Sequence, residues 1–150
     1  MSQSLARLLT HLVFSTKHRE ALIHDGIRDE LHRYSAAVLA DIDSPAILIN
    51  SVEDHVHVLF CLSKNCAVKD AVEKVKAGTS KWIKRRDAGL ANFYWQAGYG
   101  AFSVSQSNVP AVTRYIANQR EHHAKTSFQD ELRALLRRHK VEFDERYVWD

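Results

Sequence analysis

Two histidines, His55 and His57, stand one residue apart inside an apolar run that extends from residue 54 to residue 60. Successive side chains of a β-strand point to opposite faces of its sheet, so this spacing places both imidazoles on one face. The other face is expected to be apolar and part of the core, and it carries Val56, Val58, Phe60 and Leu62. Two histidines held on one rigid strand form half of a divalent-metal site.

The spacing of these histidines, taken alone, is weak support for a metal site. The chain has 9 histidines among 150 residues, so chance gives such a pair in roughly every second chain of this kind. The alternative is a pair of half-exposed strand histidines with no ligand. A metal site therefore needs further donors from elsewhere in the sequence.

A helix predicted over residues 109–120 supplies such donors. Pro110 suits the first helical turn, and apolar side chains follow helical spacing at Val109, Val112, Ile116 and Ala117. Tyr115 and Gln119 are i,i+4 neighbours, which puts both on one helix face beside the apolar stripe. Laid on the sheet, this helix brings a phenol and an amide oxygen to the two imidazoles. The alternative is that Tyr115 lies at the rim of the core and Gln119 in solvent.

Several segments of the chain, in their order, resemble a known family. They are HLVFSTKHR near the start, then DHVHVLF, the basic VEKVKAGTSKWIKRR, FYWQAGYGAFSVS and finally YIANQ. These segments are similar to those of the single-tyrosine HUH transposases, the TnpA-type enzymes that move insertion sequences as single-stranded DNA, and of their REP-associated relatives. The resemblance covers residues 8–124.

The expected elements alternate between strands and helices. Strands are expected at residues 8–15, 46–52 and 55–62 and near 93–96 and 101–105, and helices at residues 27–40, 68–86 and 109–120. This order predicts an α+β, ferredoxin-like (RRM-like) βαββαβ sandwich with an added C-terminal tyrosine-bearing helix. The first and third strands are neighbours in this topology, so His11 is expected near the histidine pair, in a packing role. The resemblance implies that the tyrosine helix covers the sheet face that the other helices leave free.

The length of 150 residues suits one compact domain. Residues 1–125 are expected to form the HUH transposase catalytic domain, and residues 126–150 a C-terminal helical extension of the same domain. In the extension, residues 126–129 can form a capping box, and a short amphipathic helix is indicated by Phe128, Leu132, Leu135 and Leu136. No chemistry is assigned to the extension.

Composition excludes several classes of protein. A hydrophobic content of 45% excludes a disordered chain. No apolar stretch is long enough to cross a membrane and no cleavable signal opens the chain, so we expect a cytoplasmic protein without membrane contact. Cys61 and Cys66 have no second cysteine pair, so no structural zinc site is expected and both thiols are expected to be reduced.

Positive charge is concentrated in one segment, although the net charge of +3 says nothing by itself about nucleic acid. Residues 64–86 hold eight lysines and arginines against Asp70 and Glu73. A solvated helix face is the alternative, with the last basic residues interacting with the helix dipole. Beside the histidine and tyrosine motifs we favour DNA phosphates, with five candidate contacts: Lys17, Arg19, Lys74, Lys76 and Lys81. Trp95 and Tyr99 can stack on bases, although core packing explains Trp95 equally well.

The resemblance implies phosphoryl transfer without water. Tyr115 is the expected nucleophile, becoming linked to a DNA 5′-phosphate while the other end leaves as a 3′-hydroxyl; reaction with a different 3′-hydroxyl transfers the strand. The expected cofactor is a divalent cation held by His55, His57 and Gln119. The family implies Mg or Mn, although imidazoles also suit Zn. His122, about one turn after Gln119, is the alternative third ligand.

The resemblance also implies the partners. They are single-stranded DNA, commonly with a hairpin, and a second copy of the chain in a homodimer. In the family the tyrosine helix of one subunit often completes the other subunit's site, and the sequence does not decide whether that exchange occurs here.

Two other functions stay open. One is an RRM-type sheet that binds single-stranded nucleic acid without cutting it, although no RNP-like aromatic pair is present. A domesticated, inactive transposase is the more credible version of that function. The other is a metal-dependent hydrolase in which water attacks and Tyr115 only orients the substrate.

Overall fold

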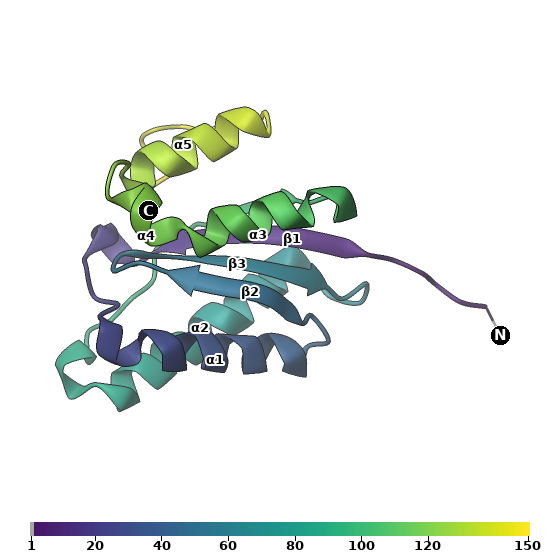
Figure 1. Ribbon diagram of the computed structural model, residues 1–150. Helices are drawn as coiled ribbons and strands as arrows, with labels where there is room; N and C mark the ends of the chain where they lie inside the picture. The colour runs from purple at the N-terminus through teal and green to yellow at the C-terminus, as the bar shows by residue number, and fades with distance from the viewer. Residues whose placement is uncertain (1) are drawn as a thin grey trace.

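The computed structural model describes residues 2–150 (Figure 1). Four antiparallel strands form one sheet in the order β2-β3-β1-β4. The strands are β1 (Leu8–Ser15), β2 (Ala46–Ser51), β3 (His55–Leu62) and β4 (Gly100–Ser103). The α-helices are α1 (Asp25–Asp41), α2 (Val68–Arg86), α3 (Val109–Ala117), α4 (Gln119–His123) and α5 (Phe128–Arg138). Short 3-10 helices are η1 (Lys17–Arg19), η2 (Ala88–Leu90) and η3 (Gln106–Asn108). The predicted α+β, ferredoxin-like fold is confirmed.

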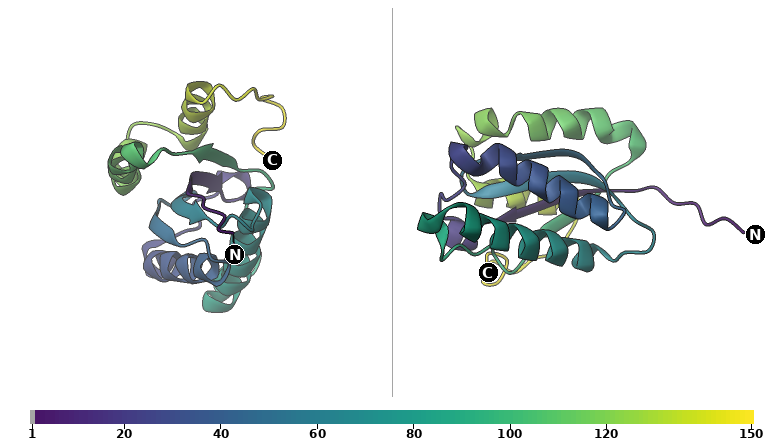
Figure 2. Two further views of the ribbon diagram at one scale, coloured as in Figure 1. Left: turned by 90° about the vertical axis from the view of Figure 1, so that its right-hand side faces the viewer. Right: turned by 90° about the horizontal axis from the view of Figure 1, so that it is seen from below.

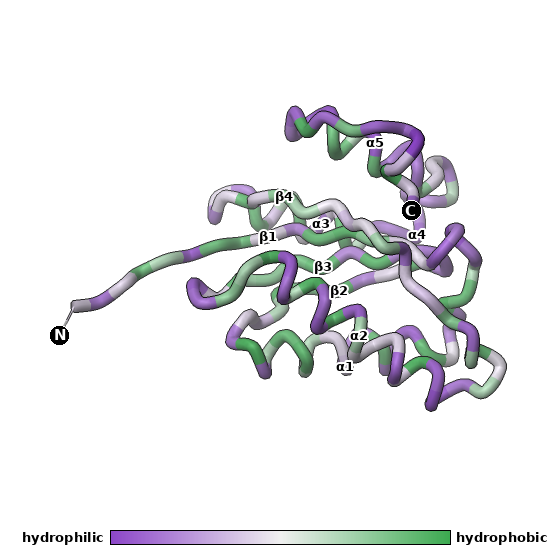
Figure 3. The backbone as a smooth tube through the Cα atoms, turned by 180° about the vertical axis from the view of Figure 1, so that it is seen from behind, coloured by the Kyte–Doolittle hydropathy of each residue, from purple (hydrophilic) through white to green (hydrophobic). Residues whose placement is uncertain are grey.

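One face of the sheet packs against α1 and α2 (Figures 1 and 2). In α1 the side chains of Ile27, Leu31 and Leu39 are buried at helical spacing. The alternate β3 residues Val56, Val58, Phe60 and Leu62 join the same core, as the strand alternation predicts. Figure 3 shows how apolar and polar residues alternate along these elements. Since β3 lies beside β1 in the middle of the sheet, its other face presents the two histidines to the second helix layer.

The second face of the sheet is covered by α3, α4 and α5 (Figures 1 and 2). The helix predicted in the C-terminal extension is present as α5, and the Ser127 side chain caps it by accepting a hydrogen bond from the Asp130 backbone N–H. A second hydrophobic cluster fixes α5 to the sheet; it contains Val13, Phe102, Phe128, Leu132, Leu135 and Leu136. The extension therefore packs directly over the histidine-bearing face.

The tyrosine helix differs from the prediction, because it ends at Ala117 instead of continuing to residue 120. The Asn50 side chain of β2 donates from Nδ2 to the carbonyl oxygens of Ile116, at 2.8 Å, and Ala117, at 3.3 Å. These carbonyls would otherwise accept from the next helical turn. Gln119 consequently begins a separate short helix, α4, and its side-chain amide donates a hydrogen bond back to the Tyr115 carbonyl oxygen, at 3.3 Å.

The strand predicted near residues 93–96 is reduced to one isolated bridge between Thr16 and Trp95. The ammonium of Lys76 in α2 donates to the carbonyl oxygens of Gln96, at 2.8 Å, and Gly98, at 2.7 Å. The Gln96 backbone N–H still donates to the Ser15 carbonyl of β1, but the Gln96 carbonyl accepts from Lys76 and does not extend the ladder, so the pairing stops there. Among residues 2–150, no helix is both long enough and apolar enough to span a bilayer.

Candidate metal and tyrosine site

The two strand histidines are completely buried on the face covered by α3, α4 and α5, and both ring nitrogens of each have side-chain neighbours. His57 Nδ1 lies 2.8 Å from Nε2 of His11, and His57 Nε2 lies 2.9 Å from the Glu131 carboxylate. His55 Nδ1 lies 2.6 Å from the carboxylate of Asp54. Half-exposed strand histidines are therefore excluded. His11, on the neighbouring strand, lies next to the pair as the topology predicts.

The side chains of Tyr115 and Gln119 both reach the histidines within a single chain. The Tyr115 ring centre is 5.7 Å from that of His57, with the rings edge to face. Gln119 is fully buried, and its Oε1 lies 3.4 Å from His55 Nε2. The structure therefore brings together all four residues proposed for the reaction, although Tyr115 and Gln119 stand on different helices.

The carboxylate of Glu131 in α5 joins these groups to one another. Its Oε1 lies 2.9 Å from Nε2 of His57 and 2.9 Å from Nε2 of His123, and 3.3 Å from Nε2 of His55. Its Oε2 accepts a hydrogen bond from the Tyr115 hydroxyl. Glu131 is 2% exposed, so this charge is stabilised by the imidazoles and not by water.

The charges of the site follow from burial and from these contacts. Burial opposes ionisation of Glu131, but the hydrogen bonds from three imidazoles outweigh it and hold the pKa of the carboxyl far below its usual range. Burial, and then the Glu131 charge, raise the pKa of the Tyr115 phenol well above its ordinary value. Burial opposes the charge on His55, yet hydrogen bonds with Asp54 and Glu131 raise its pKa to about 9. The resting site thus holds a carboxylate, a protonated His55 and a neutral phenol.

The donor set fits a divalent cation. Ligand atoms of His55, His57, His123 and Glu131 all lie within 4.8 Å of one another. The Gln119 amide oxygen is close enough to His55 to join them. His122 adds a buried Nε2 that lies 3.3 Å from Oε2 of Glu131. Imidazole nitrogens with carboxylate and amide oxygens suit Mn, Mg or Zn.

The model of a protein family described as "Transposase IS200 like" matches residues 4–119. The chain belongs to this family. The ISDra2 transposase TnpA of Deinococcus radiodurans is 21% identical over 116 residues, which cover 74% of this chain and 83% of that protein. The predicted family, which includes the TnpA-type transposases, is therefore confirmed.

Two solved structures share the fold of this IS200-like transposase. A transposase structure from Deinococcus radiodurans R1 has a TM-score of 0.64 at 20% identity, covering 79% of this chain and 98% of that one. A REP-associated tyrosine transposase bound to a REP hairpin has a TM-score of 0.60 at 14% identity, covering 84% of this chain and 76% of that one.

Sequence reasoning missed Glu131 and His123, which lie beyond residue 119, where the family match ends. A signal was nevertheless present. Glu131 follows Phe128 by three residues and precedes Leu135 by four, so it stands on the apolar stripe of α5. A carboxylate on the buried face of an amphipathic helix needs cationic or donor partners, which the histidines supply.

The five basic residues proposed for phosphate contacts are placed differently from one another. Lys17 and Arg19 lie in η1, between β1 and α1. Lys74 and Lys81 are exposed on α2, across the sheet from the histidines. The Lys76 ammonium donates to backbone carbonyls, and burial lowers its pKa to about 8, so it is an intramolecular donor.

The two aromatic residues proposed for base stacking also differ in exposure. Trp95 is buried, and its indole N–H donates to the Thr79 hydroxyl, which agrees with core packing. Tyr99 is 41% exposed.

Proposed function

We propose that this transposase cleaves and rejoins single-stranded DNA through a covalent link between Tyr115 and a 5′-phosphate. One observation carries the proposal: the Tyr115 hydroxyl and the buried imidazoles of His55 and His57 meet at one carboxylate, that of Glu131. A tyrosine nucleophile keeps the broken end attached to the enzyme and conserves the phosphoester for rejoining.

The proposed step is a displacement at phosphorus. The phenolic oxygen of Tyr115 forms a bond to phosphorus, the bond from phosphorus to the 3′-oxygen breaks, and that oxygen takes up a proton as it leaves as a 3′-hydroxyl. The phenolic proton passes to solvent water at the same time, so one proton leaves the phenol and one joins the 3′-oxygen. In the resting site the Glu131 charge opposes this departure, because a second negative charge would form beside the first.

We propose that His55, His57 and Gln119 hold a divalent cation, Mg or Mn, with Glu131 and His123 as further donors within reach. When bound, such a cation supplies the positive charge that polarises the scissile phosphate and compensates the developing phenolate. His11 contacts His57 Nδ1 and Asp54 contacts His55 Nδ1, so both imidazoles are oriented by a second residue.

Single-stranded DNA with a hairpin is the proposed substrate, supported by the structural likeness to a REP-associated transposase bound to a REP hairpin. Lys17 and Arg19 are proposed phosphate contacts at the end of β1; contacts from Lys74 and Lys81 stay predictions. Tyr115 and the proposed metal ligands His55, His57 and Gln119 meet within one chain, which supports cleavage in cis. A homodimer stays a prediction from the family.

The test is to incubate the protein with labelled single-stranded DNA and Mn and to look for a denaturant-resistant protein–DNA adduct. Tyr115→Phe should abolish the adduct and keep DNA binding, whereas Tyr34→Phe, in α1 on the far side of the sheet, should keep both. Cleavage that survives in Tyr115→Phe would support attack by water. DNA binding without any adduct in the parent protein would support a domesticated, non-cleaving transposase. The hydrogen bond from Tyr115 to Glu131, which keeps the phenol neutral, also favours that alternative.

A further inference from the structure

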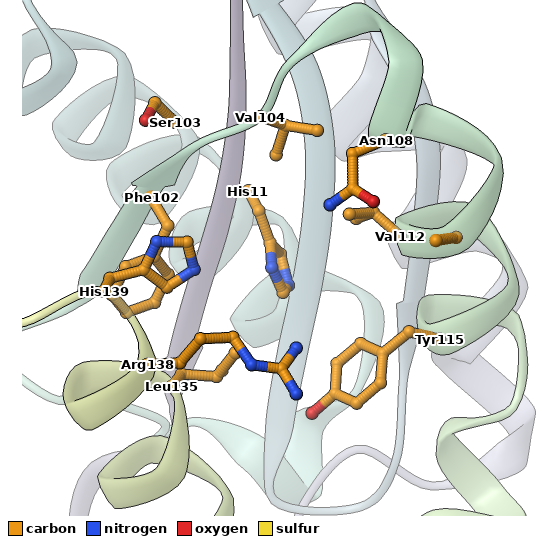
Figure 4. A pocket seen from close by; sticks show the side chains of 11 residues that line it. His11, Phe102, Ser103, Val104, Asn108, Val112, Tyr115, Leu135, Arg138 and His139 are labelled. Carbon is orange, nitrogen blue, oxygen red and sulfur yellow. The ribbon is translucent and has the colours of Figure 1, made fainter.

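A cavity of about 180 Å³ opens beside Tyr115, between β4, the start of α3 and the end of α5 (Figure 4). Its walls include His11, Phe102, Asn108, Val112, Tyr115 and Arg138. None of His55, His57, His123 and Glu131 lines this cavity; Tyr115 and His11, which contact Glu131 and His57, stand between the cavity and those residues. Such a volume holds a flat ring system and not merely a single water molecule.

The walls of this cavity suit a planar heterocycle. The rings of Phe102 and His139 are stacked, with centres 4.5 Å apart and planes 22° from parallel, and both line the cavity with the apolar side chains of Val112 and Leu135. Flat aromatic and apolar walls favour stacking. Polar groups stand between them: the Asn108 amide, which offers donors and an acceptor, and the His11 imidazole.

An unpaired cation stands where the cavity meets the tyrosine. The guanidinium of Arg138 and the hydroxyl of Tyr115 point toward the same end of the cavity (Figure 4). Arg138 is exposed, and no hydrogen bond or ion pair joins it to another group in residues 2–150. By contrast Arg133, five residues earlier in α5, is bound to Asp130 and Glu145. A free guanidinium beside a nucleophile is suited to bind a phosphate through two parallel hydrogen bonds.

We propose that this cavity binds the nucleobase of a nucleotide that adjoins the scissile phosphate, with Arg138 contacting that phosphate. The inference rests on the proposed function, because Tyr115 identifies which phosphate the base adjoins. The cavity then selects the cleavage position: a base seated beside Phe102 and His139 sets the phosphate next to it in front of the Tyr115 hydroxyl.

The experiment titrates the ¹⁵N-labelled full chain, followed by NMR, with the four deoxynucleoside 5′-monophosphates and with deoxyribose 5-phosphate, which lacks a base. At least one nucleotide should bind with a dissociation constant of about 1 mM and at least about tenfold more tightly than deoxyribose 5-phosphate. Ala111→Phe fills the cavity from α3 and should weaken nucleotide binding about tenfold or more, while Ala37→Phe, at an exposed position of α1, should leave it unchanged.

Arg138→Ala should weaken binding of the nucleotide and of deoxyribose 5-phosphate alike, and Arg137→Ala, the neighbouring exposed arginine, should weaken neither. The proposal is overturned if no nucleotide binds up to about 10 mM, if the base adds nothing to affinity, or if Ala111→Phe binds as the parent does. Nucleotide binding that follows these expectations in a protein that forms no DNA adduct would contradict the proposed function alone.

Discussion

The carboxylate of Glu131 touches both the proposed nucleophile and the proposed metal ligands. It accepts from the Tyr115 hydroxyl on one oxygen and from His57 and His123 on the other. This single buried charge, after burial, raises the pKa of the Tyr115 phenol, and together with Asp54 it raises the pKa of His55.

Replacing the charge of Glu131 should lower the pKa of the Tyr115 phenol. In the metal-free protein, Glu131→Gln keeps the size of the side chain but removes the charge, so the pKa of Tyr115 should fall toward its ordinary value, although burial still holds it above that value. The measurement is a spectroscopic titration of phenolate, with Tyr115→Phe subtracted to identify the residue. Asp130→Asn, its exposed neighbour in α5, should change nothing. An unaltered phenol pKa in Glu131→Gln would show that the carboxylate does not control the tyrosine.

The same cluster predicts how Mn affinity responds to mutation. By calorimetry, His57→Asn should weaken Mn binding about 100-fold, because the proposed site loses a strand ligand, and Glu131→Gln about tenfold. His32→Asn provides the matched control, since His32 is a partly buried histidine of α1 on the opposite sheet face. Equal losses in His57→Asn and His32→Asn would mean that Mn binds elsewhere.

At the scale of elements, α5 holds Glu131 in place through its apolar stripe. Leu132 is 2% exposed and packs in the cluster with Val13 and Phe102. Leu132→Ala should lower the free energy of unfolding by about 2–4 kcal/mol, because a buried cavity replaces the side chain. Urea denaturation measures the change. Leu5→Ala, at a residue 86% exposed, should cost less than about 0.5 kcal/mol, and equal costs for the two variants would contradict this packing.

The sequence predicts correctly the strands and helices whose bounds follow from the spacing of their own apolar residues. The bounds of β1, β3 and α2 agree with the prediction, because alternation in the strands and the buried spacing of Val68–Arg86 are local signals. Long-range hydrogen bonds decide the rest. Asn50 accompanies the end of the tyrosine helix at Ala117, and Lys76 binds the carbonyls of Gln96 and Gly98 that a longer strand would pair. Neither bond is visible in a pattern confined to one segment.

The candidate site divides in the same way. The histidine spacing predicts one face of one strand, and the family resemblance adds Tyr115 and Gln119, which the structure brings to that face. Glu131 was missed because the facing of α5 against the sheet depends on how the whole extension folds back. The residue pattern of a helix predicts which of its faces is buried, but it does not predict which other element packs against that face.

At the scale of the whole molecule, histidines in different environments should set how stability depends on pH. Burial lowers the pKa of His32 to about 4, whereas hydrogen bonds with Asp54 and Glu131 raise that of His55 to about 9. The unfolded chain protonates both near 6.5. Below pH 6.5 His32 is protonated in the unfolded state but neutral in the folded state, so the stability of the folded state falls toward pH 4. Above pH 6.5 His55 is neutral in the unfolded state but still protonated in the folded state, so stability also falls toward pH 9. The metal-free protein should therefore be most stable near neutrality.

Burial also lowers the pKa of His11 and of His57, so three histidines contribute to the loss of stability in acid, and the share of His32 can be measured separately. The His32 ring is partly buried, away from the proposed metal ligands, and its Nε2 lies 2.7 Å from the Ser51 hydroxyl oxygen. His32→Gln should shrink the loss of unfolding free energy between pH 6.5 and 4 by about 1–2 kcal/mol, an amount reduced from the full pKa shift because solvent reaches part of the ring. Urea denaturation across this range, in the presence of a chelator, measures it. His18→Asn, at an exposed position, should keep the parent profile. An acidic limb of equal depth in parent and His32→Gln would assign the loss to other groups, since His32 would then carry the same proton in both states.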